Sequence, residues 1–183
     1  MTERSDEELM LAFKQDEATA FNVLYGRYKD ALYRYFLRNI KNEATSQELF
    51  QDLWMKVINS KENYQVKATF KTWLYTLAHN RLVDWYRRNN LEQKAFQENT
   101  EDDVDGIINW KPEDELQTKR LSKEIKNAVS QLPFAQREVF LLHNEALLSL
   151  PQIAQMLDEG IEKIKSRYRY ALARLRNNLE KMR

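Results

Sequence analysis

The sequence is poor in the residues that cross-link a chain or turn it sharply. Its 183 residues include no cysteine, three glycines and three prolines. Without cysteine the protein can form no disulfide bond, no thiolate metal site and no cysteine nucleophile. A β protein would need more turn-forming residues than these. Apolar residues instead recur at intervals of three and four, and this spacing predicts an all-α fold.

Long apolar runs are also absent. No run approaches the roughly 20 residues with which a helix crosses a bilayer. The N-terminal residues, Met-Thr-Glu-Arg-Ser-Asp-Glu-Glu, do not have the pattern of a signal peptide. We therefore expect a cytoplasmic protein with no membrane insertion of its own.

The residue patterns of enzymes are missing as well. The two histidines, His79 and His143, lack the neighbours of a metal site or a catalytic triad. There is no glycine-rich phosphate loop, and the acidic residues do not follow the spacing of a calcium loop. The sequence predicts no catalytic residue, no metal, no cofactor and no enzymatic activity.

The net charge of +1 averages segments of opposite sign. Residues 91–117 hold nine acids but only two lysines, together with a glycine and a proline. Such a composition does not bury a core and is typical of a spacer. We predict a flexible acidic linker here, joining two small helical domains at residues 1–90 and 118–183.

A helix-turn-helix motif is predicted close to the C-terminus. Ser149 and Gln152 have the spacing of a capping box, which begins a short helix. The polar turn 158–160 then precedes a long basic helix. Residues 161–183 carry eight Lys or Arg and two acids. A face of one sign suits DNA phosphates, whereas a solvated helix face usually mixes charges. An ordinary helical hairpin with a solvated basic face is the alternative.

The N-terminal domain is predicted to contain four amphipathic helices. The first opens at Ser5, and the second begins near Ala18 with a stripe of aromatic residues that we assign to the core. Thr45 or Ser46 is expected to cap a third helix, which runs from Gln47 to about residue 60. The first turns of this helix carry a compact polar set, Gln47, Glu48, Gln51 and Asp52.

The fourth predicted helix, 70–89, combines tryptophans with cations. Proteins that bind single-stranded nucleic acid stack bases on aromatic rings and follow phosphates with Lys and Arg. Trp73 and Trp85 have the spacing of core residues, so we expect them to face inward rather than stack on bases. Beyond the linker, two further helices are predicted at about 118–131 and 134–145.

Four stretches of the chain resemble one known family, the extracytoplasmic-function (ECF) sigma factors of bacterial RNA polymerase. Residues 46–54, Ser-Gln-Glu-Leu-Phe-Gln-Asp-Leu-Trp, are similar to the family's core-binding helix. Residues 70–88, which begin Phe-Lys-Thr-Trp-Leu-Tyr-Thr-Leu-Ala-His-Asn-Arg, are similar to its helix for promoter melting and minus-10 recognition. Residues 132–142 and 164–171 are similar to its minus-35 domain. The stretches occur in the family's order, and the resemblance covers nearly the whole chain.

The resemblance implies a dissociable initiation subunit that binds core RNA polymerase and promoter DNA, with an anti-sigma factor as a further partner. Residues 1–90 would form the sigma region 2 domain and residues 118–183 the region 4 domain. Docking on core polymerase, which involves the β′ clamp helices and the β subunit, is implied for Gln47, Glu48, Leu49, Gln51, Asp52 and Leu53. Holding the opened minus-10 strand is implied for Lys67, Thr69, Asn80, Arg81, Asp84, Arg87 and Arg88. Reading the minus-35 element in the major groove is implied for Lys165, Ser166, Arg169 and Tyr170. Phosphate contacts beside that element are implied for Lys163, Arg167 and Arg174.

The chain departs from the family at the turn of the helix-turn-helix. Asp158 stands where Gly is usual, Gly160 where Ser or Thr is usual, and Lys163 where a small residue is common. Asp adopts a left-handed turn more readily than most residues, though less readily than Gly. Gly is only slightly weaker than Ser or Thr as a helix cap. The promoter sequence that this helix prefers therefore cannot be copied from a relative.

Two other functions fit an all-α chain with this motif. One is a self-sufficient helix-turn-helix transcriptional regulator whose N-terminal helices sense a ligand or dimerise. The other is a helical scaffold or anti-factor that binds only protein. Binding to core polymerase separates a sigma factor from both.

Overall fold

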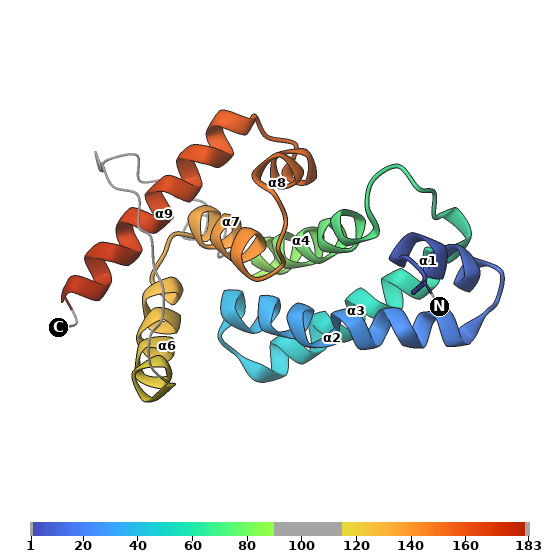
Figure 1. Ribbon diagram of the computed structural model, residues 1–183, viewed down its shortest axis with the longest axis horizontal. Coiled ribbons are helices and arrows are strands. Elements are labelled where there is room, and N and C mark those ends of the chain that lie inside the picture. Colours follow the sequence, from blue (N-terminus) through green and yellow to red (C-terminus); the bar gives the residue numbers. More distant parts are fainter. Residues whose placement is uncertain (1, 90–114, 182–183) are drawn as a thin grey trace. The chain divides into compact units, whose positions relative to one another are not determined.

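The computed structural model describes residues 2–89 and 115–181, and every regular element in these two stretches is a helix (Figure 1). The predicted all-α class is confirmed. The chain divides into two compact units, Met1–Asn89 and Asn90–Arg183. Most of the predicted acidic linker, residues 91–114, lies outside the described residues.

The first helix, α1, spans Asp6–Lys14 and begins as predicted. Ser5 accepts a hydrogen bond from the backbone of Glu8, whose side chain accepts one in return from the Ser5 backbone, completing a capping box. The helix buries Leu9, Met10 and Phe13.

Helices α2, Ala18–Ile40, and α3, Glu43–Asn59, pack against each other. Of the aromatic stripe of α2, Tyr28, Tyr35 and Phe36 enter the core as predicted, whereas Tyr25 is 37% exposed. The predicted start of α3 is wrong, because Asn42 caps the helix through a 2.9 Å hydrogen bond from the Thr45 backbone N–H to its side-chain oxygen. Asn caps as well as Ser, so α3 begins four residues earlier than expected and Ser46 is buried within it.

Helix α4, Phe70–Arg88, follows the short 3-10 helix η1, Lys61–Asn63. The side chains that α4 buries in its core-facing stripe include Leu74, Tyr75, Ala78, Leu82 and Tyr86. Two residues predicted to face inward, Trp73 and Trp85, are only half-buried at the edges of this stripe. The prediction followed the largest apolar side chains, whereas the two tyrosines fix the rotation of the helix.

The second unit contains α6, Glu115–Ser130, α7, Phe134–Asn144, α8, Leu150–Leu157, and α9, Ile161–Lys181 (Figure 1). Helix α6 begins three residues before the predicted position, so residues 115–117 of the expected linker are helical. One core cluster joins residues of α6, the turn after it, α7 and α9: Ala128, Val129, Leu132, Leu141, Ala171 and Leu175.

Helices α8 and α9 form the predicted helix-turn-helix. Ser149 and Gln152 complete a capping box at the start of α8. Asp158 ends α8 in the left-handed conformation with φ of 54°, and its backbone N–H is directed at the carbonyls of Ala154 and Gln155. The left-handed turn expected of Asp158 is therefore present. Among the residues described, no helix has the length and apolar character to cross a membrane.

Candidate nucleic-acid interface

The polar set on α3 forms an accessible surface. Gln47, Glu48 and Gln51 are exposed, and Asp52 is half-buried. Two apolar neighbours implied in the same surface are not part of it. Leu49 and Leu53 are each 1% exposed, because they lie on the opposite face of α3 within the core. They position the polar face and are unavailable for contact with a partner.

An ion pair connects this face to α4. The Arg81 guanidinium donates from Nη2 to Asp52 Oδ2 at 2.6 Å and from Nε to the same oxygen at 3.2 Å. The Arg81 side chain is 21% exposed, so it lies partly beneath the surface. Because Arg81 binds Asp52 in the free protein, this pair has to open before Arg81 can hold the minus-10 strand, the role that the resemblance implies. The pair places the polar face of α3 beside the polar face of α4.

The polar face of α4 carries most of the residues assigned to the minus-10 strand. Asn80, Asp84, Arg87 and Arg88 are all exposed. Trp85 is half-buried against Tyr86, with ring centroids 5.2 Å apart, and part of its indole stays accessible. Exposed cations and a partly accessible ring on one helix are the components that bind unpaired nucleotides.

The loop before α4 contributes the two remaining residues of this set. Lys67 is exposed. Thr69 caps α4, since its hydroxyl accepts the Thr72 backbone N–H at 3.2 Å and shares a 2.8 Å hydrogen bond with the Thr72 hydroxyl. Thr69 thus has a structural role that the sequence assignment did not include.

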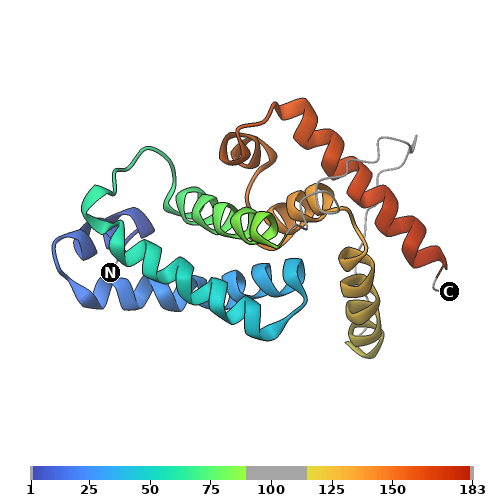
Figure 2. The same ribbon diagram turned by 180° about the vertical axis from the view of Figure 1, so that it is seen from behind.

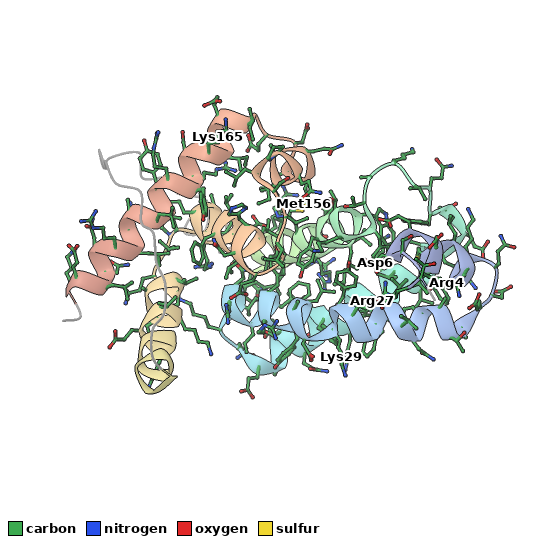
Figure 3. All side chains as sticks on the ribbon, viewed as in Figure 1. Arg4, Asp6, Arg27, Lys29, Met156 and Lys165 are labelled. Atoms are coloured by element: carbon green, nitrogen blue, oxygen red, sulfur yellow. The ribbon has the colours of Figure 1, made fainter. Side chains whose placement is uncertain are left out.

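Helix α9 presents the residues assigned to the minus-35 element. Lys165 and Arg169 are exposed, whereas Ser166, Tyr170 and Arg174 are half-buried (Figure 3 labels Lys165). The Arg169 guanidinium lies 5.6 Å from the centre of the Tyr170 ring. A cation held over a ring is partly ordered before it meets a ligand.

Two of the predicted phosphate contacts on α9 bind an acid within the turn. Arg167 Nη2 lies 3.2 Å from Glu159 Oε1, and Lys163 Nζ lies 3.1 Å from Glu159 Oε2. The Arg167 side chain is only 14% exposed, so it stabilises the turn and is not an open phosphate contact. Lys163 remains 47% exposed and can turn outward.

Glu159 was missed by the sequence reasoning. The signal was present, since one acid precedes two cations at spacings of four and eight residues. Burial acts to raise the pKa of Glu159, but the hydrogen bond from Lys163 and the charge of Arg167 outweigh it and lower the pKa below its ordinary value. The charged carboxylate therefore connects the turn to the first turns of α9.

No metal site is evident in the part of the chain that the structure describes. The described residues contain no group of three or more His, Asp or Glu side chains that could hold an ion.

Comparisons with known proteins identify the family. The sequence family Sigma-70 region 2 matches residues 24–92, and Sigma-70 region 4 matches residues 128–177. RNA polymerase sigma factor YlaC of Bacillus subtilis is 25% identical over 160 residues, covering 87% of this chain and 92% of that protein. ECF RNA polymerase sigma factor SigX of the same species is 27% identical over 168 residues, covering 89% and 85%.

Two solved structures have a similar fold. The structure of CnrH in complex with the cytosolic domain of CnrY matches with a TM-score of 0.71 and 19% identity, covering 97% of this chain and 98% of that one. The sigma factor RpoE in complex with the anti-sigma factor NepR from Bartonella quintana matches with a TM-score of 0.66 and 22% identity, covering 87% and 96%. At these identities the likeness establishes the fold.

The chain forms two helical units, and the second is a helix-turn-helix whose final helix is basic. This arrangement is typical of DNA-binding proteins. The matches to region 2 and region 4, in that order along the chain, are more specific. The chain belongs to the Sigma-70 family and is a promoter-specific RNA polymerase sigma factor of the ECF type, so the predicted family is confirmed.

Proposed function

We propose that three surfaces of this sigma factor divide the work of promoter recognition. The polymerase surface is the exposed polar face of α3, Gln47, Glu48, Gln51 and Asp52, and it binds the β′ clamp helices of core polymerase. The minus-10 surface holds the opened strand through Lys67, Asn80, Asp84, Arg87 and Arg88, with Arg81 joining once its ion pair opens. The minus-35 surface reads duplex DNA through Lys165, Ser166, Arg169 and Tyr170, with Lys163 and Arg174 on phosphates.

The observation that carries this proposal is the Asp52–Arg81 ion pair, with its 2.6 Å contact. It fixes a polar protein-binding face and a cationic face side by side on adjacent helices. An initiation subunit needs this adjacency, because the DNA strand it holds must be delivered to the enzyme to which it is docked.

The polymerase surface fits a protein partner better than a nucleic acid. It presents carboxylates and amides, and carboxylates repel phosphate groups. The minus-35 surface has the opposite character, since Lys165 and Arg169 protrude from a helix with few acids. Phosphate contacts there would position α9, and contacts to base edges would specify sequence.

Core binding provides the direct test. Glu48→Ala combined with Gln51→Ala should weaken binding to core polymerase, because both side chains are exposed and their removal leaves the helix packing intact. Lys56→Ala, which changes an exposed residue of α3 outside the polar set, serves as the matched control. Affinity would be measured by titrating labelled protein with core enzyme. Equal affinity of the double variant and the control would contradict the assignment.

The minus-35 surface is tested by separating specificity from affinity. Arg169→Ala should reduce discrimination at one promoter position by about 1–3 kcal/mol if Arg169 contacts a base edge. Arg174→Ala should weaken binding to every sequence and reduce the salt dependence. Uniform loss in both variants would reassign Arg169 to the phosphates.

The alternative function, a self-sufficient regulator, predicts a different mode of DNA binding by the free chain. It would bind duplex sites tightly alone and as a symmetric dimer. We expect a monomer whose DNA binding is weak and salt-sensitive, and which gains specificity and strand opening only with core polymerase. Opening the duplex costs a few kcal/mol in unstacking, which one small helical unit can hardly offset.

Two further parts of the proposal follow from the family. The protein acts in the cytoplasm, where its polymerase is, and makes no covalent change to DNA. An anti-sigma factor is a proposed partner of this chain. RpoE of Bartonella quintana, which shares the fold, is bound by such a protein.

A further inference from the structure

Helix α1 holds the segment that leads into α4, although α1 lies far from it in sequence. Both views show α1 beside the loop between α3 and α4 (Figures 1 and 2). None of the residues assigned to polymerase or DNA lies on α1. Residues of α1 and of the turn after it nevertheless make three contacts with the loop or with the residues that flank it, each with a different chemistry.

The first contact is made by Glu7. Its Oε1 accepts the backbone N–H of Phe70, the first residue of α4, at 2.6 Å. The N–H groups of a first helical turn have no partner within the helix, and a carboxylate there also interacts favourably with the helix dipole. Together with the Thr69 cap, Glu7 fixes where α4 begins.

The second contact holds the other end of the loop. Lys14 Nζ donates to the Tyr64 backbone carbonyl at 3.1 Å. The Tyr64 side chain is buried, and its ring packs on Phe70 and Trp73, with centroid distances of 6.3 and 5.0 Å. Lys14 therefore anchors a residue that itself packs against the start of α4.

The third contact lies just upstream of the loop. Lys61 Nζ lies 2.6 Å from Asp16 and 5.0 Å from the centre of the Phe13 ring. An exposed pair of this kind contributes little alone. Combined with the cation–ring contact, it attaches η1 to the end of α1.

These contacts leave an exposed tip between two fixed points. Tyr64 and Phe70 are anchored, whereas Gln65, Val66 and Lys67 are exposed. The Val66 side chain is apolar, and the residue is 53% exposed. A loop fixed at both ends has already lost most of the freedom that binding would otherwise remove.

We propose that Glu7 and Lys14 are positioning residues for the minus-10 strand. They do not touch DNA but hold residues 65–69 in the conformation that presents Lys67 to an unpaired base and its phosphate. This inference rests on the proposed function of the loop in minus-10 binding and adds α1 as the element that orders it. A chain without these contacts would still fold and dock on polymerase. It would open the promoter poorly.

The experiment uses holoenzyme, assembled from core polymerase and each full-length variant. Its readout is the affinity for a single-stranded minus-10 oligonucleotide labelled with a fluorescent base. Glu7→Ala removes the acceptor, Glu7→Gln keeps a neutral acceptor, and Lys14→Met keeps the aliphatic chain but removes the donor. Glu17→Ala is the matched control, since Glu17 pairs with Arg4 at 2.7 Å and has no contact with the loop. Figure 3 labels Arg4, the partner of Glu17.

We expect Glu7→Ala and Lys14→Met each to weaken oligonucleotide binding about tenfold, the effect of losing one hydrogen bond to a charged group. Glu7→Gln should recover most of the loss, and Glu17→Ala should bind as the unchanged protein does. Affinity for core polymerase should not change in any variant. A purely structural role would alter core affinity and oligonucleotide affinity together.

Two results would overturn the proposal, and they differ in what else they remove. If Lys67→Ala weakens oligonucleotide binding while Glu7→Ala and Lys14→Met resemble Glu17→Ala, the loop binds DNA and α1 does not position it. If Lys67→Ala has no effect, the role of the loop in minus-10 binding fails, and the inference fails with it. Should Glu7→Ala lose its helical circular dichroism, Lys14→Met decides by the same readout.

Discussion

The two basic helices, α4 and α9, are held in place by different kinds of contact. Helix α4 is fixed by residues far away in sequence: Glu7 lies 63 positions from Phe70, and Asp52 lies 29 positions from Arg81. Helix α9 is fixed by its own turn, where Glu159 binds cations four and eight positions further on. One surface depends on the assembled unit, and the other depends on a short stretch of chain.

Because of this difference, the two surfaces should respond differently to substitutions that loosen the packing. Long-range contacts form only after loops have closed, so they are lost together when the packing of α1, α3 and α4 loosens. Local contacts survive as long as their own turn is folded. We therefore expect core substitutions in the first unit to disable α4 while α9 is unaffected.

The largest expected effect comes from emptying the core beneath α4. Leu74 is fully buried, so Leu74→Ala should destabilise the first unit by about 2–5 kcal/mol. Denaturant unfolding is followed by tryptophan fluorescence in a Trp110→Phe background, because the other tryptophans, Trp54, Trp73 and Trp85, all lie within the first unit.

A matched substitution in the second unit supplies the control. Leu142 is also fully buried, and Leu142→Ala should leave the tryptophan transition of the first unit in place. If both substitutions shifted that transition equally, the units would unfold as one and the comparison between α4 and α9 would lose its basis.

Relieving backbone strain just before α8 should give the next largest change in stability. Leu147 has φ of 59° and is 74% exposed, so it adopts a left-handed conformation with little packing in return. Such a conformation costs a side-chain-bearing residue about 1–2 kcal/mol. Leu147→Gly should stabilise the second unit by about 0.5–1 kcal/mol, part of the relief being offset by the greater chain entropy of glycine. Thermal unfolding monitored by circular dichroism would measure it.

Asp158 provides the comparison for that measurement. It has φ of 54°, but Asp adopts this conformation more readily than Leu. Asp158→Gly should therefore stabilise the unit less than Leu147→Gly does. The reverse order would mean that the Leu147 side chain makes a stabilising contact in solution.

The local contacts were the ones that sequence could predict. The helix start at Ser5, the capping box of Ser149 and the left-handed turn at Asp158 follow from residue types at fixed spacing, and the structure contains all three. These interactions involve residues only a few positions apart, so the sequence alone is enough to predict them. The Glu159 contacts belong to the same kind and were overlooked rather than hidden.

The long-range contacts could not be predicted in this way. Nothing in the chain marks Glu7 as the partner of Phe70, since the pair exists only after α1 packs beside the loop. The same holds for Asp52 and Arg81, which the sequence assigned to different partners. The inward assignment of Trp85 failed for a related reason, because the rotation of α4 is set by what it packs against.

A smaller effect should come from the ion pair between α3 and α4. Asp52 and Arg81 are partly exposed, so a double-mutant cycle of Asp52→Ala and Arg81→Ala should give a coupling of only about 0.2–1 kcal/mol. The coupling should fall as salt is added. It would be measured from urea unfolding of the four proteins, and a coupling of zero would leave the two faces adjacent but energetically independent.

The smallest effect concerns Glu159 and depends on pH. Its pKa is lowered in the folded protein, although burial alone would raise it, because Lys163 and Arg167 favour the charged carboxylate. A group with a lowered folded pKa adds stability above its unfolded pKa, and that stability is lost as the pH falls through the folded value. Glu159→Gln should therefore cost about 0.3–0.5 kcal/mol at neutral pH, the usual size for an exposed pair at this spacing.

At a pH well below the folded pKa of Glu159, the two proteins should be equally stable, because Glu159 is then protonated and neutral like Gln. Unfolding by urea at neutral pH and at that acidic pH would give the two differences. Glu180→Gln is the control, since Glu180 pairs with Arg176 at 3.1 Å near the other end of α9 and has no contact with the turn. If Glu159→Gln cost the same at both pH values, its effect would come from packing rather than charge. The start of α9 would then be fixed by the shape of the turn, and the contrast with the ion-paired α4 would be greater than proposed.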